Sequence, residues 1–190
     1  MRRAVISVIG DAGVQPGSAT YEMACDVGRL AVDAGFRVMT GGLGGVMEAA
    51  CKGAHASALY REGDTIGILP QLDPAAANPW VDIVLATGLD HARNTLVANA
   101  DAVVALGGGA GTLSEMAFAW MFKRLIVAVR GLGWADRLGD QRLDARARCD
   151  LDDDRVYSAE DGHQAMLIVV EKLPFYTGRN AGFSSSRGWP

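Results

Sequence analysis

Short apolar runs alternate with longer amphipathic segments through most of the chain. The runs are rich in valine and isoleucine and are continuously apolar, which is typical of strands covered on both faces of a sheet. We expect strands at residues 4–9, 36–40, 65–69, 81–86, 102–106 and 125–129. The intervening segments have helical spacing, and we expect helices at 18–34, 46–58, 89–99 and 112–122. Alternation of strands and helices predicts an α/β fold: a three-layer, Rossmann-like, doubly wound parallel sheet in a single domain.

The pattern weakens after residue 129. Residues 131–155 mix glycine, arginine and aspartate with little periodicity, so we expect a loop excursion there. Ser158 and Asp161 are spaced as in a capping box, which predicts a last helix that ends near Lys172. We expect residues 1–173 to form the Rossmann-like nucleotide- or phosphate-binding domain and residues 174–190, rich in glycine and serine, to form a flexible tail.

The most informative stretch follows the strand expected at 102–106. Four glycines fall within five positions, before the helix that we expect to begin at Thr112: Gly107, Gly108, Gly109 and Gly111. Such a turn brings backbone N–H groups together, and the helix adds its free N–H groups and the positive end of its dipole. The combination predicts a phosphate site. It matches neither a Walker loop nor the dinucleotide fingerprint, which disfavours an ATPase and a classical NAD site.

Two further loops are expected at the same edge of the sheet, because the carboxyl ends of parallel strands share one edge. One follows the strand at 36–40, and its Gly42, Gly44 and Gly45 either make a tight turn or face the ligand. The other contains Asp11, which either stabilises its own turn or contacts a sugar or base of the ligand.

Polar side chains near the glycine turn are candidates for ligand contacts. Glu115 lies three residues after Thr112, so it either completes a capping box or acts as an acid, a base or a ribose contact. Arg93 and Asn94 precede the strand at 102–106. A lone arginine is usually solvated, but beside a phosphate site its planar fork suits bidentate contact. His91 is more often a surface residue than a catalyst.

Composition narrows the class of protein. A formal net charge of −4 gives no basic footprint for nucleic acid or an anionic membrane, and no apolar stretch reaches membrane-spanning length. Three widely spaced cysteines without a C-x-x-C pair fit buried thiols in a reducing compartment, so we expect a cytoplasmic protein. The acidic run at 150–154 lacks the spacing of a calcium loop, and we expect no metal site.

The glycine-rich segments resemble those of one superfamily. Residues 41–48 read Gly-Gly-Leu-Gly-Gly-Val-Met-Glu, and residues 107–115 read Gly-Gly-Gly-Ala-Gly-Thr-Leu-Ser-Glu, with Arg93 upstream. These motifs are similar to those of the Lonely Guy superfamily, often labelled "lysine decarboxylase". It includes nucleoside 5′-monophosphate phosphoribohydrolases and molybdenum-cofactor carrier proteins. The resemblance spans residues 4–130 and implies a phosphate at the Gly-Thr helix start and a homodimer or higher homo-oligomer.

In the hydrolase branch the matching arginine and glutamate are catalytic, so the resemblance makes Arg93 and Glu115 the catalytic pair. Three positions differ from the hydrolases and look more like the carrier branch: Asn94 in place of lysine, Gly107 in place of proline and Ser114 in place of glutamate. We therefore expect a carrier-like protein that binds a nucleoside monophosphate or a phosphorylated pterin, with no cofactor required. The alternative is a phosphoribohydrolase that releases base and ribose 5-phosphate. A lysine decarboxylase is disfavoured, because none of the three lysines is a convincing pyridoxal lysine.

Self-association is also predicted from the apolar content of two expected helices, 89–99 and 112–122. Their large apolar side chains exceed what one sheet face covers: Leu96, Val97, Met116, Phe118, Trp120, Met121 and Phe122. We expect a homodimer with a small phosphorylated ligand and without a nucleic-acid or membrane partner.

Overall fold

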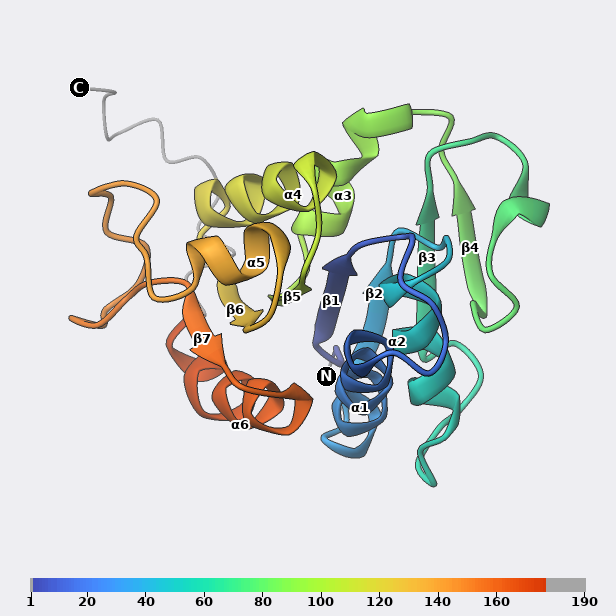
Figure 1. Ribbon diagram of the computed structural model, residues 1–190, viewed down its shortest axis with the longest axis horizontal. Helices are drawn as coiled ribbons and strands as arrows, with labels where there is room; N and C mark the ends of the chain where they lie inside the picture. Colours follow the sequence, from blue (N-terminus) through green and yellow to red (C-terminus); the bar gives the residue numbers. More distant parts are fainter. Residues whose placement is uncertain (1, 177–190) are drawn as a thin grey trace.

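In the computed structural model, which describes residues 2–176, seven strands run parallel in one sheet (Figure 1). Their spatial order is β4-β3-β2-β1-β5-β6-β7. The strands are β1 (Val5–Gly10), β2 (Arg37–Thr40), β3 (Thr65–Leu69), β4 (Ile83–Ala86), β5 (Ala102–Leu106), β6 (Leu125–Val129) and β7 (Tyr157–Ala159). The α/β class predicted from the apolar runs is confirmed.

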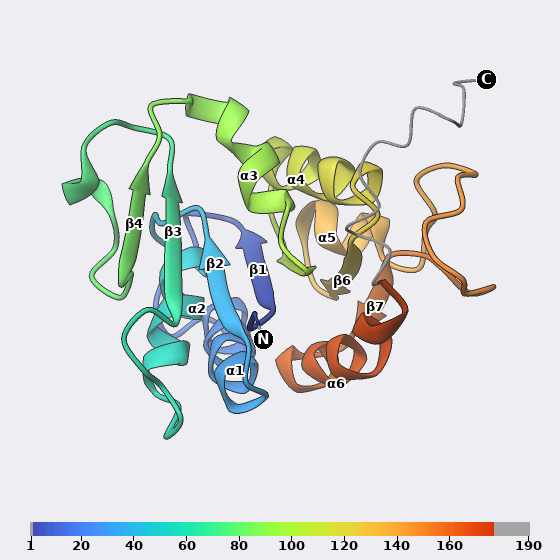
Figure 2. The same ribbon diagram turned by 180° about the vertical axis from the view of Figure 1, so that it is seen from behind.

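Helices cover both faces of the sheet, which gives the three predicted layers (Figures 1 and 2). One layer holds α1 (Ala19–Asp33), α2 (Val46–His55) and α6 (Gly162–Lys172), and the other holds α3 (Asn94–Ala98), α4 (Ala110–Met121) and α5 (Gly133–Leu138). Short 3₁₀ turns are η1 (Pro74–Ala76), η2 (Asp90–Arg93) and η3 (Leu173–Tyr176). Each face has its own buried cluster, with Ile6 and Val8 under the first layer and Ile9 and Met39 under the second.

The sheet order places β1 at the centre, between β2 and β5. The chain builds β2, β3 and β4 on one side of β1 and then crosses to β5 on the other side. The topological switch point therefore lies between β1 and β5, where connections diverge to opposite faces and leave a crevice at the carboxyl edge. Gly10 ends β1 there, and a Cβ on it would lie 2.9 Å from both methyl groups of Val46. This close approach brings the start of α2 against β1.

Several boundaries differ from the sequence-based expectation. The predicted loop at 131–155 contains α5, and Ser158 belongs to β7, which pairs with β6, so it does not open the last helix. Asp161 caps α6 instead, where its carboxylate accepts a hydrogen bond from the Gln164 N–H at 2.8 Å. The helix expected at 89–99 is divided into η2 and α3.

The described part of the chain ends in η3. Its last residue, Tyr176, is buried and donates a hydrogen bond of 2.6 Å to Asp154. The first three residues of the predicted tail, 174–176, thus belong to η3, and 177–190 lie outside the described residues. Within residues 2–176, no helix combines the length and apolar character needed to cross a bilayer.

Candidate functional site

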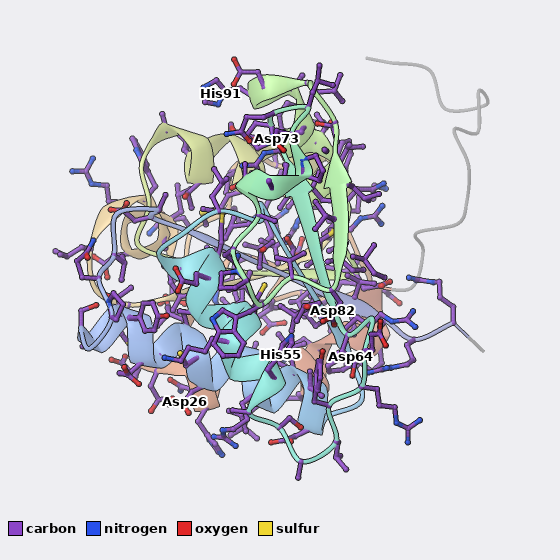
Figure 3. The ribbon with its side chains drawn as sticks, turned by 90° about the vertical axis from the view of Figure 1, so that its right-hand side faces the viewer. Asp26, His55, Asp64, Asp73, Asp82 and His91 are labelled. Atoms are coloured by element: carbon purple, nitrogen blue, oxygen red, sulfur yellow. The ribbon has the colours of Figure 1, made fainter. Side chains whose placement is uncertain are left out.

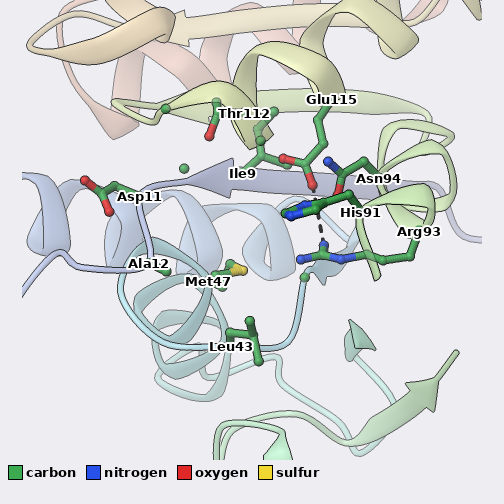
Figure 4. A pocket seen from close by; sticks show the side chains of 14 residues that line it. Ile9, Asp11, Ala12, Leu43, Met47, His91, Arg93, Asn94, Thr112 and Glu115 are labelled. Atoms are coloured by element: carbon green, nitrogen blue, oxygen red, sulfur yellow. Dashed lines mark hydrogen bonds and ion pairs between the residues drawn. The ribbon is translucent and has the colours of Figure 1, made fainter. Parts of the chain in front are cut away.

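A pocket of about 200 Å³ opens where the carboxyl ends of β1, β2 and β5 meet (Figure 4). Loops after all three strands line it, as predicted from the parallel topology, together with the end of η2 and the start of α3. The lining residues are Ile9, Gly10, Asp11, Ala12, Gly41, Leu43, Met47, His91, Arg93, Asn94, Gly109, Gly111, Thr112 and Glu115. This is the switch-point position at which open α/β sheets bind ligands.

The glycine turn after β5 leads directly into α4 at the wall of this pocket. Gly107 and Gly108 have φ angles of +64° and +87°, a backbone region that glycine adopts without strain. Gly109 is the N-cap and α4 begins at Ala110, so the N–H groups of residues 110–112 belong to the first helical turn and have no partner inside the helix. A Cβ at Gly109 or Gly111 would meet no atom within 4 Å. The backbone here is open to a ligand.

The capping-box interpretation of Thr112 and Glu115 is wrong. Because α4 begins two residues earlier than expected, Thr112 is its third helical residue and is buried beside Gly108. Glu115 lies on the next turn and points to Arg93 (Figure 4), with 3.4 Å between the arginine Nη1 and the glutamate Oε1. The structure thus brings together the arginine and the glutamate that the motif singled out.

Burial dominates the electrostatics of this pair. Arg93 is 9% exposed and Glu115 is 7% exposed. Burial raises the pKa of Glu115 to about 7, against the attraction of Arg93, and burial lowers the pKa of Arg93, against the attraction of Glu115. A carboxyl with a pKa near neutrality can hold or release a proton under working conditions. The Nε of Arg93 is buried and has no hydrogen-bond partner among the described residues.

The loop after β2 supports Arg93 through its backbone. A Cβ on Gly41 would lie 2.6 Å from Nη2 and 2.8 Å from Cζ of Arg93, so only glycine leaves room for the guanidinium. Gly42 and Gly45 have φ angles of +76° and +63° and shape the turn, and Gly45 packs on the backbone of the loop after β1. The loop lines the pocket with Gly41 and Leu43. Gly42, Gly44 and Gly45 are not among the lining residues, and a ligand contact by these three stays a prediction.

Asn94 and Asp11 combine structural contacts with a position at the pocket. The Asn94 side-chain amide donates to the Ser114 hydroxyl at 2.8 Å, and that hydroxyl donates to the Gly111 carbonyl at 2.7 Å. This chain of bonds ties α3 to the first turn of α4. The Asp11 carboxylate accepts from the Gly13 N–H at 2.7 Å, so the turn-stabilising role is present while the side chain also lines the pocket (Figure 4).

The histidines divide between the rim of the pocket and a separate cluster. The His91 side chain is 89% exposed at the rim. His55 lies far from it, beside Asp82 (Figure 3), stacked on Tyr60 with ring centroids 4.0 Å apart. Asp82 lies just before β4, near the amino ends of the strands. His55, which contacts Asp82, therefore lies at the opposite edge of the sheet from the pocket, which is at the carboxyl ends.

Ile9, Leu43 and Met47 give the pocket its apolar surface. Leu43 and Met47 lie within the glycine-rich segment 41–48, but Ile9 belongs to an apolar strand and carries no sequence signal that separates it from core. A supporting residue, Asn78, was not predicted either. Asn78 fixes the loop after β2: its N–H donates to the Gly42 carbonyl at 2.8 Å and its side-chain amide donates to the Leu43 carbonyl at 2.9 Å. It lies in a proline-containing loop without a motif.

The fold and the position of the pocket define the class of protein, a ligand-binding protein built on a Rossmann-like sheet. Comparison with known families is more specific: the chain belongs to the SLOG cluster4 family, whose model matches residues 3–166. The resemblance to the carrier-like branch seen in the glycine motifs is thereby confirmed.

Solved structures with the same fold include two proteins that handle the molybdenum cofactor. The molybdenum cofactor binding protein from Rippkaea orientalis is 30% identical, with a TM-score of 0.74 over 90% of this chain and 98% of that chain. The molybdenum cofactor carrier protein from Chlamydomonas reinhardtii is 30% identical, with a TM-score of 0.70 over 91% of this chain and 99% of that chain.

A curated relative from Archaeoglobus fulgidus is an uncharacterised protein. It is 43% identical over 101 residues, which is 53% of this chain. The match covers 64% of that relative, so it spans less than two thirds of the relative's length.

Proposed function

We propose that this protein is a carrier that binds a phosphorylated pterin or a nucleoside monophosphate at the switch-point pocket, with the molybdenum cofactor as the first candidate cargo. The observation that carries the proposal is the start of α4. Its free first-turn N–H groups, an open glycine turn and a nine-tenths-buried arginine with an unpartnered Nε all meet at one pocket. Helix N-termini with such turns favour phosphate groups. The named solved neighbours supply the first cargo to test.

In this proposal the ligand phosphate contacts the backbone at residues 108–112. Its ring system lies against the apolar wall of Ile9, Leu43 and Met47, and Arg93, Asn94 and Asp11 supply polar contacts along the same pocket. A mixture of apolar wall and a few polar groups is typical of sites for heterocyclic cofactors. The protein needs no other cofactor to do this.

Ser114 favours a carrier over an enzyme. Hydrolysis at an anomeric carbon relies on positioned carboxylates. Here the residue beside Glu115 is a serine whose hydroxyl is already used between Asn94 and the Gly111 carbonyl. That leaves Glu115 as the carboxylate next to Arg93, held in a buried pair.

The test pairs analysis of the native cargo with a charge-matched set of variants. Mass spectrometry of the denatured native preparation should find a phosphorylated pterin or nucleotide, and calorimetry should measure its affinity. Gly111→Asp places a carboxylate where the phosphate would bind, while an aspartate in the first helical turn does not weaken α4. Gly111→Asn has the same size without the charge. We expect Gly111→Asp to lose binding far more than Gly111→Asn. Equal affinities for the two variants, or a wild-type protein that binds no phosphorylated pterin or nucleotide, would contradict the proposal.

A second candidate is the phosphoribohydrolase, and the observation in its favour is the neutral-range pKa of Glu115 beside Arg93. Incubation with a panel of nucleoside monophosphates, followed by chromatography of the free base, tests it. Base release that disappears in Glu115→Gln while the nucleotide still binds would support the enzyme. If the wild-type protein releases no free base, the phosphoribohydrolase proposal is contradicted and the carrier proposal stands.

We also infer a homodimer, through the layer that holds α3 and α4. Leu96 and Met121 are 43% and 46% exposed, whereas Val97, Met116 and Trp120 lie in the core and take no part in such a surface. The connection from β3 to β4 contains η1 and no α-helix, so Ile83 and Leu85 on the edge strand also remain exposed. Exposed apolar surface of this kind is typical of association sites. The cytoplasmic location expected from the sequence stays a prediction.

A further inference from the structure

The turn that we propose for phosphate binding is held from behind by α5. The N–H of Trp134 donates to the Gly108 carbonyl at 3.0 Å, and the N–H of Ala135 donates to the Gly107 carbonyl at 3.0 Å. Both donors belong to the first turn of α5, where N–H groups have no intrahelical partner. The two N–H groups at the start of α5 that lack a partner within the helix are thus hydrogen-bonded to the carbonyl groups of the glycine turn.

These two bonds also fix the direction of the N–H groups in the turn. In a trans peptide the C=O of one residue and the N–H of the next point in opposite directions, and the chain has no cis peptide bond among the described residues. With the carbonyls of Gly107 and Gly108 directed to α5, the N–H groups of Gly108 and Gly109 are directed away from α5. Gly109 lines the pocket. The hydrogen bonds from α5 therefore orient the Gly107–Gly108 and Gly108–Gly109 peptide groups without a bound ligand.

We propose that α5 is the positioning element of the anion site and that Gly133 is its positioning residue; this inference rests on the proposed binding of a phosphate at residues 108–112. A Cβ on Gly133 would lie 2.5 Å from the Gly108 oxygen, 2.7 Å from the Gly107 carbonyl carbon and 2.8 Å from the Gly108 nitrogen. All three are backbone atoms of the turn, so they cannot move aside as a side chain would. A methyl group at residue 133 would turn both peptide planes.

Gly133 also has a φ angle of +76°, so alanine there carries backbone strain as well as a steric effect. Gly35 provides a matched control, because its φ angle is +84° and a Cβ on it would meet nothing within 4 Å. It lies just after α1, away from the pocket lining. Gly35→Ala therefore introduces a similar backbone strain without a steric clash against the glycine turn.

The experiment measures AMP and inorganic phosphate binding by calorimetry, and stability by urea denaturation, for wild type, Gly133→Ala and Gly35→Ala. We expect Gly133→Ala to lower the AMP affinity by about tenfold, as when one hydrogen bond to a charged group is lost. We expect Gly35→Ala to bind AMP as wild type does, although its backbone strain also lowers stability. Equal AMP affinity in wild type and Gly133→Ala would overturn the inference alone. A wild-type protein that binds neither AMP nor inorganic phosphate would contradict the anion site at residues 108–112, on which this inference rests.

Hydrogen exchange of the wild-type protein provides a measurement that does not depend on how Gly133→Ala folds. If α5 orients the turn, saturating AMP should slow exchange at the Trp134 and Ala135 amides, because the turn and α5 must then separate against the bound ligand. Unchanged exchange at these two amides, together with slower exchange at residues 110–112, would contradict the positioning role.

Discussion

Arg93 and Glu115 show how burial can raise the pKa of a carboxyl to about 7 even beside a cation. Both side chains are nine-tenths buried or more, and the 3.4 Å separation gives only part of the attraction that a close bidentate pair would have. Burial of two charges costs free energy that the pair recovers only with good geometry and further hydrogen bonds. The Nε of Arg93 has no hydrogen-bond partner among the described residues, so this pair lacks one of those further bonds.

Glu115 should make stability depend on pH. Its pKa of about 7 in the folded protein lies above its ordinary value of 4.5, so the folded state binds the proton more tightly. The stability that this provides is fully present below pH 4.5 and is lost as the pH rises through 7. At about 1.4 kcal/mol per pKa unit, the change is at most roughly 3 kcal/mol. Urea denaturation from pH 4.5 to 8 should show this loss for wild type relative to Glu115→Gln. Parallel curves for the two proteins would contradict the shifted pKa.

Gly41 should affect ligand binding only through Arg93. A methyl group there would displace the guanidinium, so Gly41→Ala and Arg93→Ala should both weaken AMP binding. The effects of residues that act through one contact do not add. Calorimetry of the two single variants and the double variant should therefore show the double variant no weaker than Arg93→Ala. An additive loss would show that Gly41 acts on the ligand by another route.

At the scale of elements, the sequence indicates the parts of the fold that carry their own local signal. The continuous apolar runs predict six of the strands, and Ser18, which accepts from the Tyr21 N–H, caps α1 where expected. β7 and α5 carry no such signal. β7 has three residues and exists through its pairing with β6, and α5 depends on its bonds to Gly107 and Gly108. The glycine turn and Arg93 could be predicted from their motif, but Ile9 in the apolar pocket wall and the supporting Asn78 could not.

The segment between α5 and β7 is anchored by one buried ion pair. The Arg148 guanidinium donates to Asp154 and lies 3.5 Å from the centre of the Trp120 ring, and Tyr176 of η3 also donates to Asp154. The side chains of Arg148 and Asp154 are 1% and 2% exposed. This network joins α4, the segment before β7 and the end of the described chain.

Arg148→Ala should therefore be strongly destabilising. It leaves the Asp154 carboxylate buried without its cation, and losses of this kind are about 3–5 kcal/mol. Arg146→Ala is the control, because Arg146 pairs with Asp144 at the surface and is 62% exposed. We expect a change of at most about 0.5 kcal/mol for it. Urea denaturation measures both. Similar midpoints for the two variants would show that the buried network contributes little.

At the scale of the whole molecule, the apolar surface of α3 and α4 should hold two copies together. Leu96→Glu combined with Met121→Glu places charges in the inferred interface and should convert a dimer to a monomer in sedimentation at micromolar concentration. Leu167→Glu is the control, because Leu167 is 57% exposed on α6 in the other helical layer. A wild-type protein that sediments as a monomer, or dissociation by Leu167→Glu alone, would contradict this interface.

In the proposed function, the glycine turn and the start of α4 hold the phosphate of the ligand. The most direct measurement is a ¹H–¹⁵N correlation spectrum of the labelled protein during titration with AMP or with the cargo recovered from the native preparation. We expect the largest shifts at the amides of Gly108, Gly109, Gly111 and Thr112, because a phosphate accepts hydrogen bonds from N–H groups at a helix start. Shifts centred elsewhere, for instance around His55 and Asp82, with these four amides unchanged, would contradict it.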